Sequence, residues 1–87
     1  MTASNETIIF SDLANLDQAL TEDKSGDRAR AMIRYFAEIA DESSAMLKST
    51  QVDAERQLVT QLIQAFYASQ RVIQRIWETL HGTTLVV

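Results

Sequence analysis

Glycine and proline, the residues that most often interrupt helices, are nearly absent from this chain. Its 87 residues include no proline and only two glycines, Gly26 and Gly82. Few breakers among many strong helix formers are typical of helical proteins. A hydrophobic content of 46% argues against intrinsic disorder. The sequence therefore predicts an all-α fold, and its length is enough for one domain.

Capping residues and apolar spacing place three helices. A short helix is expected over residues 11–20, where Ser11 can act as the N-cap and leucines repeat at helical spacing. A second is expected over residues 27–48, after the polar linker 21–27, and a third over residues 51–81, ended by Gly82. The connection between the two long helices is short, so they should pack antiparallel.

The expected architecture is an antiparallel, coiled-coil-like helical hairpin with a short N-terminal helix. It would form one domain over residues 11–87, preceded by a flexible segment over residues 1–10. The order of the apolar ends, residues 7–10 and 83–87, is left open. In the first long helix, a heptad seam is expected to face inward. It contains Ala29, Met32, Phe36, Ile39, Ser43 and Met46.

The last helix is apolar over an unusually wide arc. On a helical wheel its apolar residues cover roughly 220°, whereas docking on one surface needs about 100°. The first long helix can cover only part of this arc, and the short N-terminal helix could cover some of the rest through Leu13, Leu16 and Leu20. A self-contained three-helix bundle is therefore the less favoured alternative. Large exposed apolar patches usually mark binding sites, and aromatic residues are favoured anchors. The candidate partner-binding residues are Leu58, Leu62, Ala65, Phe66, Val72, Ile73, Ile76, Trp77 and Leu80.

The residues that carry chemistry are too scattered to form a catalytic, cofactor or metal site. The chain has no cysteine, and its single histidine, His81, is expected to act at a helix end. Asp41 and Glu42 are adjacent acids that we expect to be solvated rather than a general acid–base pair. The two glycines form no phosphate-binding loop. The sequence therefore predicts no enzyme and no cofactor.

Charge and hydropathy also limit the expected partners and location. The net charge is −4, and no basic stripe with interleaved aromatic residues predicts nucleic-acid binding. No apolar run approaches the roughly 20 residues of a membrane span, and no signal peptide is visible. Together with the absence of cysteine, these features predict a location in the cytoplasm.

Four stretches resemble the small helical-hairpin co-chaperones of bacterial type III secretion systems. They are FSDLANLDQAL, DRARAMIRYFAEIADESSAMLK, ERQLVTQLIQAFYASQRVIQRIWETLHG and the apolar TLVV, which together span about residues 11–87. The resemblance implies pairing with a helical-repeat chaperone that keeps a needle-type or other secreted subunit soluble. It also implies that the long second helix carries the partner contact, through Phe66, Ile73, Trp77 and their neighbours.

Two other functions use the same features. A homodimer of two hairpins, forming a four-helix bundle, would bury the same apolar arc without another gene product. A small secreted helical hairpin is ranked lower, because Trp77 lies late in the second helix rather than at the turn.

Overall fold

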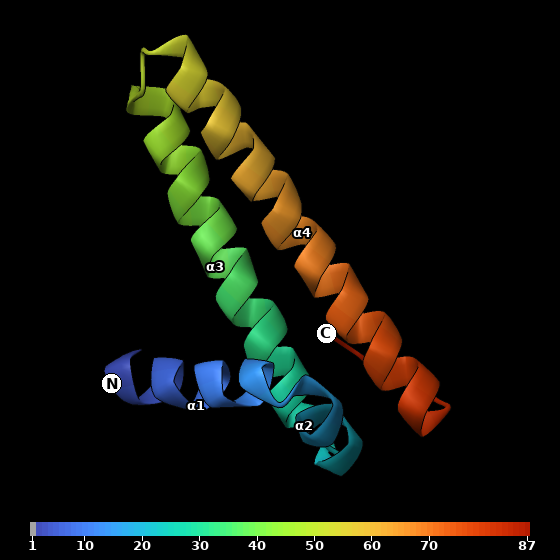
Figure 1. Cartoon of the computed structure of the whole chain (residues 1–87). Coiled ribbons are helices and arrows are strands. Elements are labelled where there is room, and N and C mark those ends of the chain that lie inside the picture. Colours follow the sequence, from blue (N-terminus) through green and yellow to red (C-terminus); the bar gives the residue numbers. More distant parts are fainter. Residues whose placement is uncertain (1) are drawn as a thin grey trace.

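The computed structural model describes residues 2–87, with side chains from Glu6 onward. Within this range it contains four α-helices, α1 (Thr2–Ala14), α2 (Leu16–Glu22), α3 (Asp27–Ser49) and α4 (Asp53–His81). Figure 1 shows that α3 and α4 run antiparallel, lie close together at their connecting turn and separate toward the other end. Helix α1 runs across the beginning of α3, and α2, which follows α1, lies beside the beginning of α3. The predicted all-α hairpin with short N-terminal helices is confirmed.

The hairpin has two differently built ends. We call the open end the base, where α1, α2, the beginning of α3, the end of α4 and the C-terminal residues meet (Figure 1). We call residues 41–62, around the turn between α3 and α4, the tip. Residues 83–87 return between α3 and α4 at the base, and we call them the C-terminal strap. The long dimension of the molecule is 44 Å, set by the two long helices.

The two long helices begin and end close to the predicted residues. Helix α3 extends over Asp27–Ser49, against a prediction of 27–48, and α4 over Asp53–His81, against 51–81. Gly82 has φ 67°, in the left-handed region, and its N–H donates to the carbonyl of Glu78 at 2.8 Å. This glycine ends α4 as predicted, because the left-handed conformation costs a residue without a Cβ little.

The N-terminal prediction was wrong in extent. Residues 2–10, expected to be flexible, belong to α1, and Ser11 lies inside that helix instead of capping one. The break comes at Asn15, which separates α1 from α2. Residues 7–10 are β-branched or aromatic and lower helix propensity, but tertiary packing outweighs propensity. Ile9 is buried in the core, and the Phe10 ring packs edge-on against Tyr35.

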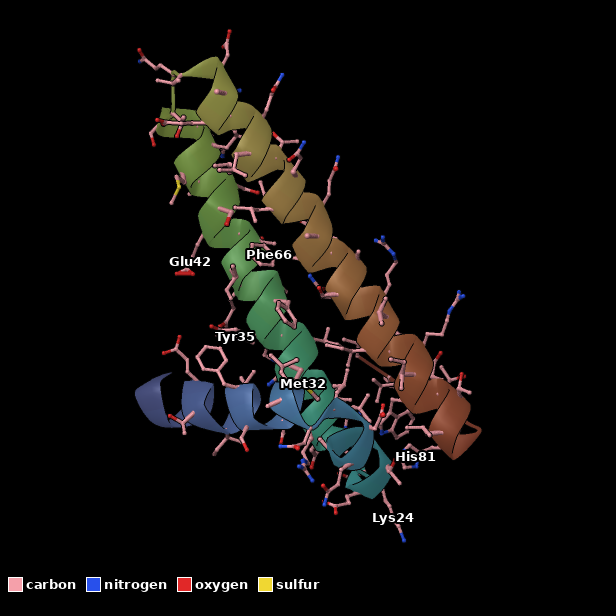
Figure 2. The ribbon with its side chains drawn as sticks, in the orientation of Figure 1. Lys24, Met32, Tyr35, Glu42, Phe66 and His81 are labelled. Atoms are coloured by element: carbon pink, nitrogen blue, oxygen red, sulfur yellow. The ribbon has the colours of Figure 1, made fainter. Side chains whose placement is uncertain are left out.

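The core lies at the base and joins every element of the fold. Leu20 and Met32 are fully buried, and burying one such side chain contributes about 1.5–3 kcal/mol. Figure 2 shows Met32 beside the crossing of α1 and α3. The buried cluster is Ile9, Leu20, Ala29, Met32, Ile33, Ile73, Trp77 and Leu85. Because its members come from all parts of the chain, the base is a tertiary core and not a two-helix contact.

The inward-facing seam of α3 agrees with the predicted one over the first turns of the helix and departs from it farther along. Ala29 and Met32 are buried and Phe36 stacks on Phe66 of α4, as a seam requires. Farther along, Ala40 is fully buried whereas Met46 is exposed, so the prediction for Met46 was wrong. The heptad pattern of apolar residues fitted two neighbouring registers, and the smaller Ala40 occupies the buried position that the sequence pattern did not indicate.

Candidate partner-binding face

The nine candidate residues of α4 fall into three groups by burial. Ile73 and Trp77 are buried, and Phe66 and Ile76 are half-buried. The remaining five are exposed to solvent, namely Leu58, Leu62, Ala65, Val72 and Leu80. These five are the candidates that expose a large fraction of their surface to solvent.

Ile73 and Trp77 are internal residues, so the expectation that they face a partner needs correction. Trp77 is 4% exposed, and its indole Nε1–H donates to the backbone carbonyl of Asp23 at 2.7 Å. Both side chains belong to the core cluster at the base. The helical wheel could not separate them from the exposed residues, because α2 and the C-terminal strap cover this flank through contacts distant in sequence.

Phe66 and Ile76 join the hairpin interior to its surface. The rings of Phe66 and Phe36 stack with centroids 6.2 Å apart and planes 22° from parallel. Figure 2 shows Phe66 between the two long helices. Ile76 packs against the core cluster from outside. These contacts fix the rotation of α4 about its own axis, so that the neighbouring face of the helix is exposed to solvent.

The exposed residues form one stripe along α4, which we call the open stripe. It consists of Leu58, Leu62, Ala65, Val72 and Leu80, at spacings that return to the same side of a helix. Ser69 lies in line with them, and its hydroxyl donates to the carbonyl of Ala65 at 2.8 Å. The polar group of this serine is therefore satisfied within the helix, and it does not interrupt the apolar surface.

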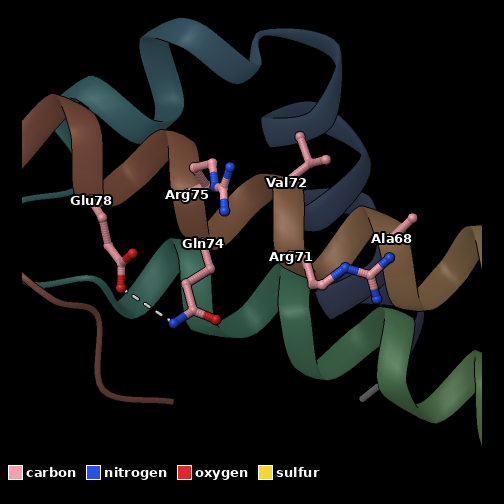
Figure 3. Close-up of a pocket in the computed structure, with 6 residues that line it drawn as sticks. All are labelled: Ala68, Arg71, Val72, Gln74, Arg75 and Glu78. Atoms are coloured by element: carbon pink, nitrogen blue, oxygen red, sulfur yellow. Dashed lines mark hydrogen bonds between the residues drawn. The ribbon is translucent and has the colours of Figure 1, made fainter.

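One edge of the open stripe is positively charged. A surface pocket of about 440 Å³ lies along α4, and Val72 of the stripe lines it together with Ala68, Arg71, Gln74, Arg75 and Glu78. Figure 3 shows these side chains and the hydrogen bond from Gln74 to Glu78. Neither Arg71 nor Arg75 forms an ion pair with a side chain of residues 6–87. Both guanidinium groups are therefore available to an acidic group from outside.

His81 has a structural role at the base. Its Nε2 lies 2.7 Å from the backbone carbonyl of Leu20, and since a carbonyl only accepts, this nitrogen carries the proton. The imidazole also packs on the Trp77 ring with centroids 4.5 Å apart. The predicted helix-end role is thus directed at the C-terminal end of α2 rather than at α4 itself. Two side chains of α4 thus bind carbonyls at this end of α2, His81 that of Leu20 and Trp77 that of Asp23, the residue after the helix.

Asp23 is a connecting residue that the sequence prediction missed. Its carboxylate accepts the N–H groups of Arg28 at 3.1 Å and Ala29 at 2.8 Å, which caps the N-terminus of α3. Asp27, the first residue of α3, pairs with Arg30 at 2.7 Å. Asp23 is buried, and its carbonyl accepts from Trp77, so one residue orients α3 and α4 together.

An ion pair joins the N-terminal helices to α3. Arg28 donates from Nη2 and Nε to the two carboxylate oxygens of Asp12 at 2.7 and 3.2 Å, and its Nη1 lies 3.3 Å from Glu22. The bond to Asp12, and secondarily the one to Glu22, raises the pKa of the Arg28 guanidinium. On the other side of α1, burial and the nearby Glu6 carboxylate raise the pKa of Tyr35. The sequence offered no spacing that pairs these groups.

The C-terminal strap is held by few contacts. Leu85 is 2% exposed in the core, and three hydrogen bonds hold its backbone and that of Val86. Burying a leucine contributes about 1.5–3 kcal/mol and each hydrogen bond about 0.5–1.5 kcal/mol. Ordering a residue costs about 1–2 kcal/mol. For the five residues of the strap, gain and cost nearly cancel.

The described part of the chain shows no feature of an ion site or a membrane span. Among residues whose side chains are described, no group of three or more histidine, cysteine, aspartate or glutamate residues could hold a metal ion. Asp41 and Glu42 are exposed on α3. None of the helices over residues 2–87 is both long and apolar enough to cross a lipid bilayer.

Comparison with known proteins identifies one family. The family model described as type III secretion system regulatory protein HrpD6 matches residues 2–79, which is most of the chain. Searches of curated proteins and of solved structures found no match.

Proposed function

Because the chain belongs to the HrpD6 family of type III secretion system regulatory proteins, we propose that it acts there as a non-enzymatic co-chaperone. In this role it binds a helical partner, a helical-repeat chaperone or a secreted needle-type subunit, through the open stripe of α4. It acts in the bacterial cytoplasm, where it covers an apolar groove of the partner before secretion.

One observation carries the proposal. At the base, α2 and the C-terminal strap cover Ile73 and Trp77 of α4, yet the open stripe stays exposed beside them. Apolar residues that are scattered singly need no explanation, but a continuous row along one helix face is typical of a protein-binding surface. A helix lying in a partner's groove uses residues at this spacing.

The charge beside the stripe indicates the partner's chemistry. Arg71 and Arg75 border Val72 and have no acidic partner within residues 6–87. A partner helix or groove with an apolar centre and carboxylates along one edge would complement this surface. The partner is therefore expected to be acidic at its contact, and binding should weaken with added salt.

The test is capture of the candidate chaperone or secreted subunit by the purified chain. Leu58→Gln combined with Leu62→Gln should weaken capture by about tenfold or more, since the change removes the apolar contact of the two large residues at the tip end of the stripe. Ile8→Gln is the matched control, because Ile8 and Leu58 are both 57% exposed but Ile8 lies on α1. Helicity measured by circular dichroism should be unchanged in all variants.

The same experiment separates this function from a homodimer. Light scattering over a range of concentrations should show a monomer that associates only when the partner is added. A tight dimer that the Leu58→Gln, Leu62→Gln variant dissociates would assign the stripe to a second copy. If the Leu58→Gln, Leu62→Gln variant captured the partner as well as the unmodified chain does, the proposal would be contradicted.

A further inference from the structure

The groove that holds the C-terminal strap recognises an extended backbone. Glu78 Oε2 accepts the N–H of Leu85 at 2.9 Å, and Gln74 Nε2 lies 3.5 Å from the Leu85 carbonyl. From the opposite wall, Arg30 Nη1 donates to the carbonyl of Val86 at 3.1 Å. Side chains of both long helices thus bind main-chain groups, which every peptide carries.

The groove buries only one side chain of the strap, that of Leu85. Leu85 is buried against the core and reaches the glycine at the beginning of α3, where a Cβ on Gly26 would lie 2.6 Å from its Cδ1. The neighbouring residues Thr83, Thr84, Val86 and Val87 are all exposed. The groove therefore selects one leucine-sized anchor and tolerates other residues around it.

The groove also continues past the strap. Gln74 and Glu78, which hold Leu85, line the same pocket of about 440 Å³ as Arg71 and Arg75 (Figure 3). A segment longer than the strap has room to continue along α4, with carboxylates facing the two arginines.

We infer that this groove is a binding site for an extended segment of a partner polypeptide with one leucine-sized anchor, and that the strap is its intramolecular occupant. The strap competes at the millimolar effective concentration of a short tether. A partner segment enters when the strap opens locally, because few contacts hold it. The anchor position of Leu85 lies outside the open stripe, and only the pocket beyond it includes Val72 of the stripe. The inference does not rest on the co-chaperone function.

The test measures peptide binding by the full chain. Leu85→Asp places a charge in the apolar site and should release the strap. A fluorescein-labelled GTTLVV peptide should then bind about tenfold or more tighter than it binds the unmodified chain, because the tethered competitor is lost. The peptide GTTDVV should bind neither protein. Val87→Asp is the matched control, since Val87 is exposed, and its peptide affinity should equal that of the unmodified chain.

Two outcomes would overturn the inference. The first is a Leu85→Asp chain of normal helicity that binds GTTLVV no better than GTTDVV. The second needs no variant: the amide of Leu85 should exchange its hydrogen about a hundredfold or more faster than that of Ile73, as a locally opening segment does. Equal exchange of the two amides would mean that the strap leaves only when the base unfolds, so that no partner segment could replace it.

Discussion

At the base, α3 and α4 are covered by three further segments, whereas at the tip they have only each other. Leu20, Met32 and Trp77 are buried at the base. In residues 41–62, all described by the structure, Val59 is the single buried residue. Met46, Val52 and Leu58 are exposed there. Two helices bury one stripe each, so a wider apolar arc needs a third element. The base has that element within the chain, and the tip does not.

Leucine-to-alanine substitutions at the base and at the tip should give the largest difference in the free energy of unfolding. Leu20→Ala removes a fully buried side chain and should lower the free energy of unfolding by about 2–5 kcal/mol, because a cavity remains. Leu58→Ala changes an exposed side chain and should alter it by no more than about 0.5 kcal/mol. Urea unfolding followed by circular dichroism measures both. Similar losses for the two variants would show that Leu58 is buried in solution, which would contradict the difference between base and tip.

Alanine should destabilise the chain more at Gly26, which lies at the base against the strap, than at Gly82, the other glycine with a left-handed backbone. Gly82→Ala should lower the free energy of unfolding by about 1–2 kcal/mol, the usual cost of this conformation with a Cβ. Gly26→Ala meets the same cost, and its Cβ would also lie 2.6 Å from Leu85. Its loss should exceed that of Gly82→Ala by about 1 kcal/mol or more. Equal losses would show that the strap does not press on Gly26 in solution.

Loss of the cap at Asp23 should weaken the base by a smaller amount. Asp23→Ala leaves the N–H groups of Arg28 and Ala29 without their acceptor and should cost about 1–2 kcal/mol. Asp23→Asn keeps one side-chain oxygen and should recover part of the loss. The fluorescence of Trp77, the chain's only tryptophan, reports on unfolding of the base. An Asn variant no more stable than the Ala variant would contradict the capping role.

Acid should have the smallest effect, and it should act on the base. The bonds from Gln18 and Arg28 lower the pKa of Glu22, and those from Arg30 and Ser25 lower the pKa of Asp27. A carboxylate with a lowered pKa stabilises the folded state above its ordinary pKa, and this stability is lost as the pH falls through the lowered value. Thermal unfolding followed by Trp77 fluorescence should therefore move to lower temperature below about pH 4. Glu22→Gln with Asp27→Asn should reduce that shift, and an unchanged shift would assign it to other groups.

The hairpin could be predicted from the sequence because its determinants are local. Gly26 and Gly82 lie at the limits of the stretch that contains both long helices, and the short connection near Thr50 makes them antiparallel. Helix α1 could not be placed, because its β-branched residues are held by contacts with α3 that are distant in sequence. Residues 7–10 look similar whether or not Tyr35 packs against them.

The candidate face could be predicted only in part for the same reason. A helical wheel identifies apolar residues of α4, and five of the nine candidates are exposed in the structure. It could not indicate that Ile73 and Trp77 are covered, since their cover comes from α2 and from Leu85. Nor could it indicate Asp23, whose capping role depends on the fold of residues 23–29.

The position of Leu85 also orders events during synthesis. Every other member of the core cluster precedes it in the sequence, so the growing chain carries an incomplete core until Leu85 has been joined. Contacts between the facing parts of α3 and α4 near the turn span short sequence separations and can form early, whereas those of the base span most of the chain. Until then the core side of α4, at Ile73 and Trp77, is open to other chains, and Leu85 helps to cover it once it has left the ribosome.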